Sequence, residues 1–150
     1  MTAKTLVTDA RAALAADAGT QVRLVARRVS RFLERRMRAS DLTLAQFGLM
    51  AQIAAARDDT VGALARRMDL DQSTLSRNLR GLERAGLVEV ALVEVDLRRR
   101  AVWLTESGAR RLEAALPVWR AAEADLAARL DLEALQRLTA ASEDLTDAVV

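Results

Sequence analysis

The spacing of apolar residues along the chain predicts a mainly helical protein. Between about residues 5 and 37, valine, leucine and phenylalanine recur at steps of three and four residues, which is typical of one long amphipathic helix or of two shorter ones. The same spacing returns several times, each time behind a threonine or aspartate that can cap the first turn of a helix. These further helices are predicted over residues 44–56, 61–68, 72–85, 105–130 and from 132 onward.

The pattern changes between residues 87 and 105. The segments LVEVALVEVDL and AVWLT are rich in valine and leucine with partial alternation, which predicts the two strands of a hairpin. Gly86, just before them, can end the preceding helix in a left-handed conformation. A short helix, a three-residue break, a second helix and a two-stranded hairpin are the parts of a winged helix-turn-helix. The fold class is therefore predicted as mainly α with a small β-hairpin wing.

The second helix of this motif has the side chains that reading DNA requires. Its inward stripe consists of Leu75, Leu79 and Leu82. Glutamine can bond adenine twice, arginine can bond guanine twice, and a helix N-terminus favours phosphate. The alternative is an ordinary amphipathic helix with a solvated outer face, and the arginine-bearing hairpin that follows favours DNA binding instead. The predicted DNA-contacting residues of this helix are Gln72, Ser73, Thr74, Ser76, Arg77 and Arg80.

Composition removes several classes of function. The chain of 150 residues contains no cysteine, histidine or tyrosine, so it lacks the commonest general base, the commonest zinc ligand and every thiol. We therefore expect no enzyme, no metal and no cofactor. The sequence has no apolar run of the roughly 20 residues that span a membrane, and its N-terminus is too polar for a secretory signal. A cytoplasmic location is the corresponding expectation.

Charge is distributed unevenly although the net charge is only +2. Residues 23–38 contain seven arginines and one acidic residue, Glu34, whereas the chain from Asp131 onward is mostly acidic. Lys4 is the only lysine, and arginine is the better residue for forked contacts with phosphate or guanine. A genome rich in G and C also produces many arginines, so the bulk of them carries no functional conclusion.

Four motifs, in order, give the chain a family resemblance. They are LTLAQFGLM, LDQSTLSRNLRGLERAGLV, DLR and LTESG, within residues 42–119. This succession resembles the multiple antibiotic resistance regulator (MarR) family. The resemblance implies a homodimeric transcriptional regulator, which we expect to be a repressor, on a pseudo-palindromic operator in double-stranded DNA. It also implies that the winged helix-turn-helix of residues 39–105 is embedded between dimerisation helices, residues 1–38 and 106–150, in one structural unit.

The resemblance gives roles to the arginines of the hairpin. In the family pattern, the wing arginine two residues after an aspartate enters the minor groove, which here corresponds to Asp96 and Arg98. Residues i and i+2 of a strand point to the same side, so Asp96 can hold the Arg98 guanidinium in place. In a regular strand Arg100 shares that side, and Arg99 points the other way, towards phosphate or solvent.

The tip of the hairpin departs from the family pattern. Family wing tips are usually polar, whereas this one reads LVEVDLRR and has no glycine, proline or asparagine for a tight turn. We favour a longer wing whose apolar side packs inward. The alternatives are that this side contacts the second protomer or the sugars of DNA.

A small effector is a further implication of the resemblance. The family commonly binds small aromatic, often anionic compounds between the dimer region and the winged domain. The absence of cysteine and histidine excludes the thiol-oxidation mechanism and disfavours zinc sensing. Ordinary core packing is the favoured explanation for each candidate, and Arg35 could equally be solvated. The residues that could line such a cleft are Phe32, Arg35, Phe47, Met50, Trp103 and Trp119.

Two non-enzymatic alternatives remain open from the sequence. The winged helix could be a protein–protein interaction module that never contacts DNA, in which case retention on heparin would be weak and insensitive to salt. It could also belong to an effector-independent architectural DNA-binding protein, which would show little sequence preference.

Overall fold

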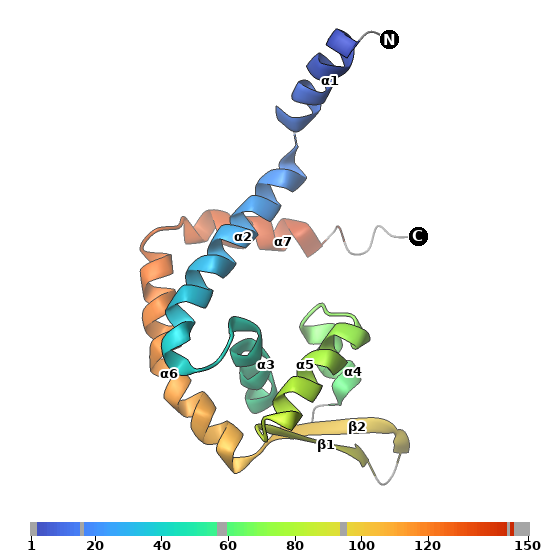
Figure 1. Ribbon diagram of the computed structural model, residues 1–150, viewed down its shortest axis with the longest axis vertical. Helices are drawn as coiled ribbons and strands as arrows, with labels where there is room; N and C mark the ends of the chain where they lie inside the picture. The colour runs from blue at the N-terminus through green and yellow to red at the C-terminus, as the bar shows by residue number, and fades with distance from the viewer. Residues whose placement is uncertain (1–2, 16, 57–59, 94–95, 144, 146–150) are drawn as a thin grey trace.

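The structure, a computed structural model, places a helical winged domain beside two terminal helices (Figure 1). It describes residues 3–15, 17–56, 60–93, 96–143 and 145, with the backbone alone at residues 3, 4, 93 and 96–99. The elements are α1 Ala3–Ala15, α2 Ala18–Met37, η1 Arg38–Ser40, α3 Leu44–Ala55, α4 Val61–Arg67, α5 Gln72–Arg84, β1 Val88–Val93, β2 Asp96–Leu104, α6 Glu106–Ala127 and α7 Leu132–Glu143. The prediction of a mainly helical chain with a two-stranded wing is confirmed.

Short polar side chains set where the helices begin, as their spacing predicts. The Thr43 hydroxyl accepts from the Gln46 N–H at 3.1 Å, and the Gln46 side chain accepts from the Thr43 N–H at 2.9 Å, a complete capping box. Thr105 caps α6 by accepting from the Gly108 N–H at 2.9 Å. α1 ends at Ala15, and Asp17 caps α2 by accepting from the Thr20 N–H at 2.8 Å.

The turn from α5 into β1 requires glycine. Gly86 has φ 70°, a left-handed conformation that is costly for other residues, and its N–H donates to the Glu83 carbonyl at 2.9 Å. The chain then enters β1, and the Leu87 carbonyl accepts from the Thr105 N–H at 3.1 Å. Gly108 packs against the same carbonyl so closely that a Cβ there would lie 1.9 Å from the Leu87 oxygen. The start of α6 is thereby fixed to the base of the hairpin.

The core lies where α3, α4, α5, the hairpin and α6 meet. Met50, Leu64, Leu75 and Leu82 are fully buried in it, which confirms the inward stripe predicted for α5. α2 is joined to α6 by an ion pair between Arg36 and Asp125. A hydrogen bond from Arg129, together with the charges of Arg129 and Arg36, holds the pKa of Asp125 below its ordinary value.

The hairpin differs from the predicted one in its boundaries and its regularity. β2 begins at Asp96 rather than at Ala101, so the arginine run belongs to the second strand. Leu92 pairs with Arg100, whereas Val93 pairs with Asp96, so residues 97–99 lie between consecutive pairs. The pairing of β2 with β1 is therefore irregular at residues 97–99, and the directions of the side chains of residues 96–99 stay a prediction. Extra residues on one strand are the usual form of a bulge, and this tip has no residue suited to a tight turn.

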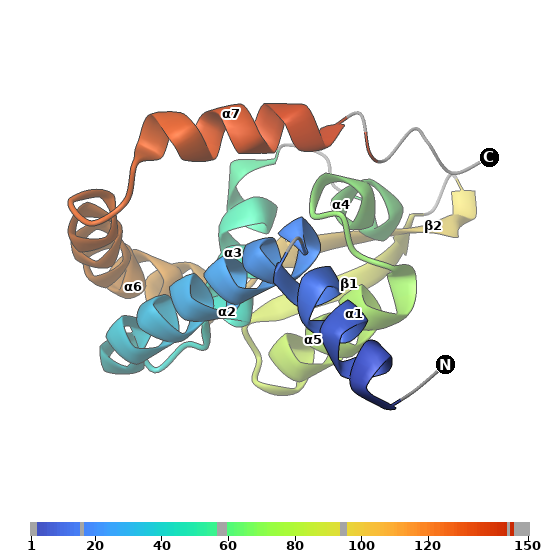
Figure 2. The same cartoon turned by 90° about the horizontal axis from the view of Figure 1, so that it is seen from above.

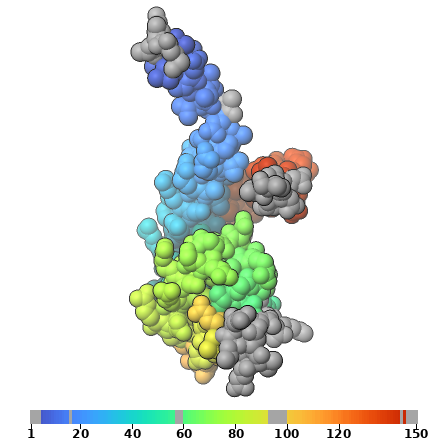
Figure 3. Space-filling model, turned by 90° about the vertical axis from the view of Figure 1, so that its right-hand side faces the viewer, coloured from blue at the N-terminus to red at the C-terminus, as the bar shows by residue number. Residues whose placement is uncertain are grey.

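The two terminal helices α1 and α7 leave their apolar residues uncovered. Figures 1 and 3 show α1 projecting from the body, and its side chains from Thr5 to Ala15 are all exposed. Along α7, Leu132, Leu135 and Leu138 each remain nearly half exposed. Seen from above in Figure 2, α1 and α7 lie at opposite edges of the molecule. In the described part of the chain, no helix is long and apolar enough to cross a membrane.

Candidate nucleic-acid interface

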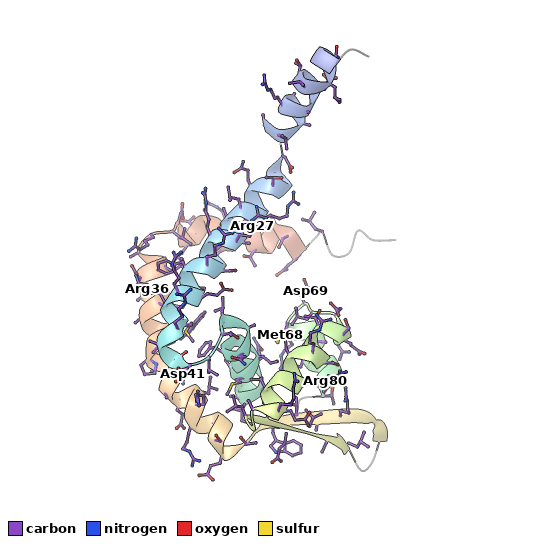
Figure 4. All side chains as sticks on the ribbon, viewed as in Figure 1. Arg27, Arg36, Asp41, Met68, Asp69 and Arg80 are labelled. Carbon is purple, nitrogen blue, oxygen red and sulfur yellow. The ribbon has the colours of Figure 1, made fainter. Side chains whose placement is uncertain are left out.

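The outer face of α5 gathers most of the residues that the sequence predicts for DNA contact on this helix. Five of them line one open cavity of about 390 Å³ on the surface, away from the leucine stripe. They are Gln72, Ser73, Ser76, Arg77 and Arg80. Figure 4 shows Arg80 on α5 near the hairpin. The surface combines donors that suit phosphate with the forked side chains that suit base edges.

Two hydroxyl groups that were predicted to contact DNA take part in the N-cap of α5. Asp71 accepts from the Thr74 N–H at 2.8 Å, from the Ser73 hydroxyl at 2.5 Å and from the Thr74 hydroxyl at 2.8 Å. These hydrogen bonds hold the pKa of Asp71 far below its ordinary value, and the bond from the Ser73 hydroxyl has the largest effect. Because the carboxylate only accepts, both hydroxyl protons point at Asp71. Ser73 can present lone pairs but no donor to DNA, and half-buried Thr74 serves the cap.

The helix before α5 packs against it and leads into it through a short turn. α4 begins after Thr60, whose hydroxyl accepts from the Ala63 N–H at 3.3 Å, and it buries Leu64 and Ala65. The turn between α4 and α5 passes through Asp69, whose φ of 49° is left-handed, and the Leu70 N–H donates to the Ala65 carbonyl at 3.0 Å. Figure 4 places Met68 and Asp69 at this turn. α4 and the turn together present the N-terminus of α5 to solvent.

The wing supplies one predicted residue whose side chain the structure describes. Arg100 is exposed and lies beside α5. The side chains of Asp96, Arg98 and Arg99 lie outside the described part of the chain, so the Asp96–Arg98 pair stays a prediction.

Leu92 is a residue of this surface that sequence reasoning missed. It belongs to the predicted apolar strand, on the face of Val88 and Val90, which are buried and half-buried. Leu92 is nevertheless 56% exposed, because the core ends before it along the hairpin. It lines a cavity of about 120 Å³ between α5 and the hairpin, together with Ser76, Arg80 and Arg100. Inward packing of the wing's apolar side therefore ends short of Leu92; the side chains of Val93, Val95 and Leu97 lie outside the described residues.

The six residues predicted for an effector cleft do not all come together. The rings of Phe47 and Trp119 stack with centroids 4.8 Å apart, and Met50 beside them is fully buried, so these three belong to the core. Trp103 lies on the outward face of the hairpin, where its Nε1–H donates to Glu89 at 3.1 Å. Arg35 is exposed on α2.

Phe32 packs against two arginine side chains where α2 meets α6. The guanidinium carbons of Arg36 and Arg129 lie 5.1 Å and 5.7 Å from its ring centroid, and both arginines bond Asp125. The ring thus joins a cluster of two cations and one carboxylate that fastens α2 to α6. This packing accounts for Phe32 without a ligand.

Comparisons with known proteins place this architecture in a family. Residues 40–99 match the model of the MarR family. The transcriptional regulator HosA of Escherichia coli O127:H6 is 34% identical over 93 residues, which are 62% of this chain and 69% of HosA. The transcriptional regulator MosR of M. tuberculosis in complex with DNA is 32% identical, with a TM-score of 0.79 over 88% of this chain and 97% of MosR. A mutant MarR of E. coli complexed with operator DNA is 25% identical, with a TM-score of 0.76 over 89% of this chain and 96% of MarR. The chain therefore belongs to the MarR family of winged helix-turn-helix transcriptional regulators.

Proposed function

We propose that the chain is a homodimeric, ligand-responsive repressor that binds a pseudo-palindromic operator in double-stranded DNA. The observation that carries the proposal is the outer face of α5, where Gln72, Arg77 and Arg80 share one open surface next to an arginine-bearing hairpin. The DNA complexes of MosR and MarR, which have the same fold, support this use of the surface.

Each contact has a distinct proposed role. Gln72 and Arg77 read base edges in the major groove, where they can bond adenine and guanine twice. Arg98 enters an adjacent minor groove, steadied by Asp96, because a narrow A·T-rich groove attracts arginine through its negative potential. Arg99 contacts phosphate. Ser73, whose hydroxyl donates to Asp71, can only accept a hydrogen bond from DNA.

The exposed terminal helices support a dimer. α1 and α7, at 13 and 12 residues, are too short to be stable in water without packing of an apolar face. Their apolar side chains, including Leu6, Leu14, Leu135 and Leu138, are nevertheless exposed on this chain. A second copy that covers these faces removes the apolar surface from water and also doubles the DNA site.

The effector response follows from the dimer as a shift of population. The dimer samples separations of its two α5 helices, and only one separation fits successive major grooves, about 34–36 Å apart. A small aromatic or anionic effector that binds more tightly to a dimer with another separation shifts the population towards that dimer. The loss of DNA affinity is then set by the ratio of the effector's affinities for the two separations. Titration of effector and operator together tests this coupling, and independent binding of the two would refute it.

Selection of bound duplexes from a random library tests the DNA-binding proposal. We expect an inverted repeat whose half-sites are about 10 base pairs apart, and an affinity that falls steeply with salt. Binding without sequence preference would indicate an architectural protein, and no salt-sensitive binding would indicate a protein–protein module.

Substitutions in α5 then separate base reading from general charge. Arg77→Ala should relax base preference at one position of each half-site, by about 1–3 kcal/mol if it bonds guanine. Arg120→Ala, which removes an exposed arginine from α6, is the matched control and should leave base preference unchanged. Equal behaviour of the two variants would contradict the role of Arg77.

A further inference from the structure

The cavity between α5 and the hairpin, which we call the notch, joins the two proposed groove-reading elements. It is lined by Ser76, Arg80 and Glu83 from α5 and by Leu92 and Arg100 from the hairpin, among others, and its volume is about 120 Å³. Ser76 and Arg80 also line the open cavity on the outer face of α5. These two residues therefore form the edge that separates the base-reading face of α5 from the notch.

The course of duplex DNA indicates what must pass through the notch. A major groove and the neighbouring minor groove are separated by one sugar–phosphate backbone. If α5 lies in one groove and the wing in the other, as the proposed function requires, that backbone crosses the space between α5 and the hairpin. We propose that the notch seats one DNA phosphate between Arg80 and Arg100, with its deoxyribose against Leu92.

The charges in the notch suit a phosphate. Arg80 and Arg100 face one carboxylate, Glu83, so the lining has an excess of one positive charge. Among the ion pairs of the described residues, none involves Arg80, Arg100 or Glu83, so both guanidinium groups are available to an anion. Guanidinium forks match phosphate oxygens, and two of them on opposite walls can hold one phosphate.

The exposed leucine suits the sugar that accompanies the phosphate. Leu92 pairs with Arg100 across the hairpin, so the apolar side chain and the cation lie next to each other in the notch. The carbon atoms of deoxyribose, which is bonded to the phosphate, offer an apolar surface next to it. Contact between the two removes apolar area from water, which gives an exposed leucine a function on a polar surface.

The inference changes the expected role of two arginines. Arg80 and Arg100 fix the position of α5 and the wing on the duplex and contribute affinity, whereas Arg77 and Gln72 carry base preference. Glu83 limits the affinity, because its carboxylate lies in the same notch as the bound phosphate.

Salt dependence of operator binding tests the arginines. On the selected operator, Arg80→Gln and Arg100→Gln should each weaken binding and lower the slope of log Kd against log salt by about 0.9, with base preference unchanged. Glu83→Gln should strengthen binding, and Arg120→Gln on α6 should change neither quantity. A changed base preference with an unchanged slope for Arg80→Gln would overturn the assignment.

Neutral methylphosphonate linkages, placed one at a time along a half-site, locate the phosphate. A neutral linkage at one position on one strand should weaken binding by the wild-type protein. On that modified duplex, Arg80→Gln and Arg100→Gln should cause no additional loss of affinity. Two different positions for the two arginines would overturn the shared phosphate. Leu92→Ser should weaken binding several-fold without a change of slope, whereas Leu92→Met should bind as the wild type does; unaltered binding by Leu92→Ser would overturn the sugar contact.

The same measurements separate this proposal from the proposed function. If the wild-type protein selects no operator and shows no salt-sensitive binding, the proposed function fails. If the wild-type protein binds its operator but the notch variants bind equally well, only the notch assignment fails.

Discussion

The winged region and the terminal helices of this chain differ in whether the chain itself buries their apolar side chains. In the winged region Leu64, Leu75 and Leu82 are fully buried among the helices and the hairpin of the same chain. On α7, Leu135 and Leu138 follow the same helical spacing but remain 43% and 49% exposed. An apolar stripe therefore predicts that a helix will be covered, and the fold decides whether its own chain covers it.

This difference separates two kinds of stability. The winged region has a closed core, so its unfolding should depend on packing within one chain. The stability of α1 and α7 should depend on the concentration of the protein if a second copy covers them. Substitutions of leucine in the two regions should therefore have different consequences.

The largest effect is expected in the closed core. Leu64→Ala should lower the free energy of unfolding by about 2–5 kcal/mol, because it leaves a cavity in a fully buried site. Urea denaturation followed by circular dichroism measures the change.

Leu135→Asp on α7 should instead weaken self-association, measured by analytical ultracentrifugation, while the winged region stays folded. A Leu135→Asp variant that remains dimeric at micromolar concentration would contradict a dimer interface on α7.

A second prediction concerns the contact between α6 and the base of the hairpin. Gly108→Ala should lower the free energy of unfolding by about 1–3 kcal/mol or more, because its Cβ would lie 1.9 Å from the Leu87 oxygen and backbone must move. Thermal unfolding at fixed protein concentration measures this loss. Wild-type stability in Gly108→Ala would show that the hairpin and α6 are not rigidly joined.

Gly81, on the outer part of α5, provides the matched control with a smaller effect of opposite sign. A Cβ at this position meets nothing within 4 Å, and the residue lies inside a helix. Gly81→Ala should therefore raise the free energy of unfolding by up to about 1 kcal/mol, because alanine loses less backbone entropy in a helix. A loss of stability would indicate that α5 packs more closely than the structure describes.

The smallest effect is expected in the pH dependence of the α5 cap. The pKa of Asp71 is lowered in the folded state from an ordinary value of about 3.8, so its contribution to stability is fully present above that pH and is lost as pH falls below it. Asp71→Asn keeps an oxygen for the Thr74 N–H but removes the charge. The stability difference between wild type and Asp71→Asn should shrink as pH falls below about 3.8, as measured by urea denaturation across that range. A difference that stays constant with pH would argue against the cap.

Local features of the fold were predictable because they depend on neighbouring residues. Thr43, Thr60, Asp71 and Thr105 begin helices where the sequence placed caps, since a side-chain oxygen needs only the N–H groups of the next turn. Gly86 ends α5 for an equally local reason, its left-handed backbone. The sequence left open whether residues 5–37 form one helix or two, and the cap at Asp17 begins the second of two.

The hairpin and the DNA surface were only partly predictable because they depend on distant residues. The start of β2 at Asp96 reflects pairing with Val93, which no local pattern of the arginine run reveals. The notch joins Arg80 to Leu92 and Arg100, residues that are separated along the chain and meet only when the hairpin folds back beside α5.

The sequence by itself thus determined the helices, their caps, the wing and the polar face of α5, because hydrophobic period and capping act over one or two turns. Tertiary structure alone decided which apolar stripes are covered, since burial depends on what the rest of the chain brings against each face. It also decided that Leu92 stays in solvent beside two arginines, because the end of the hairpin extends past the core and lies next to α5.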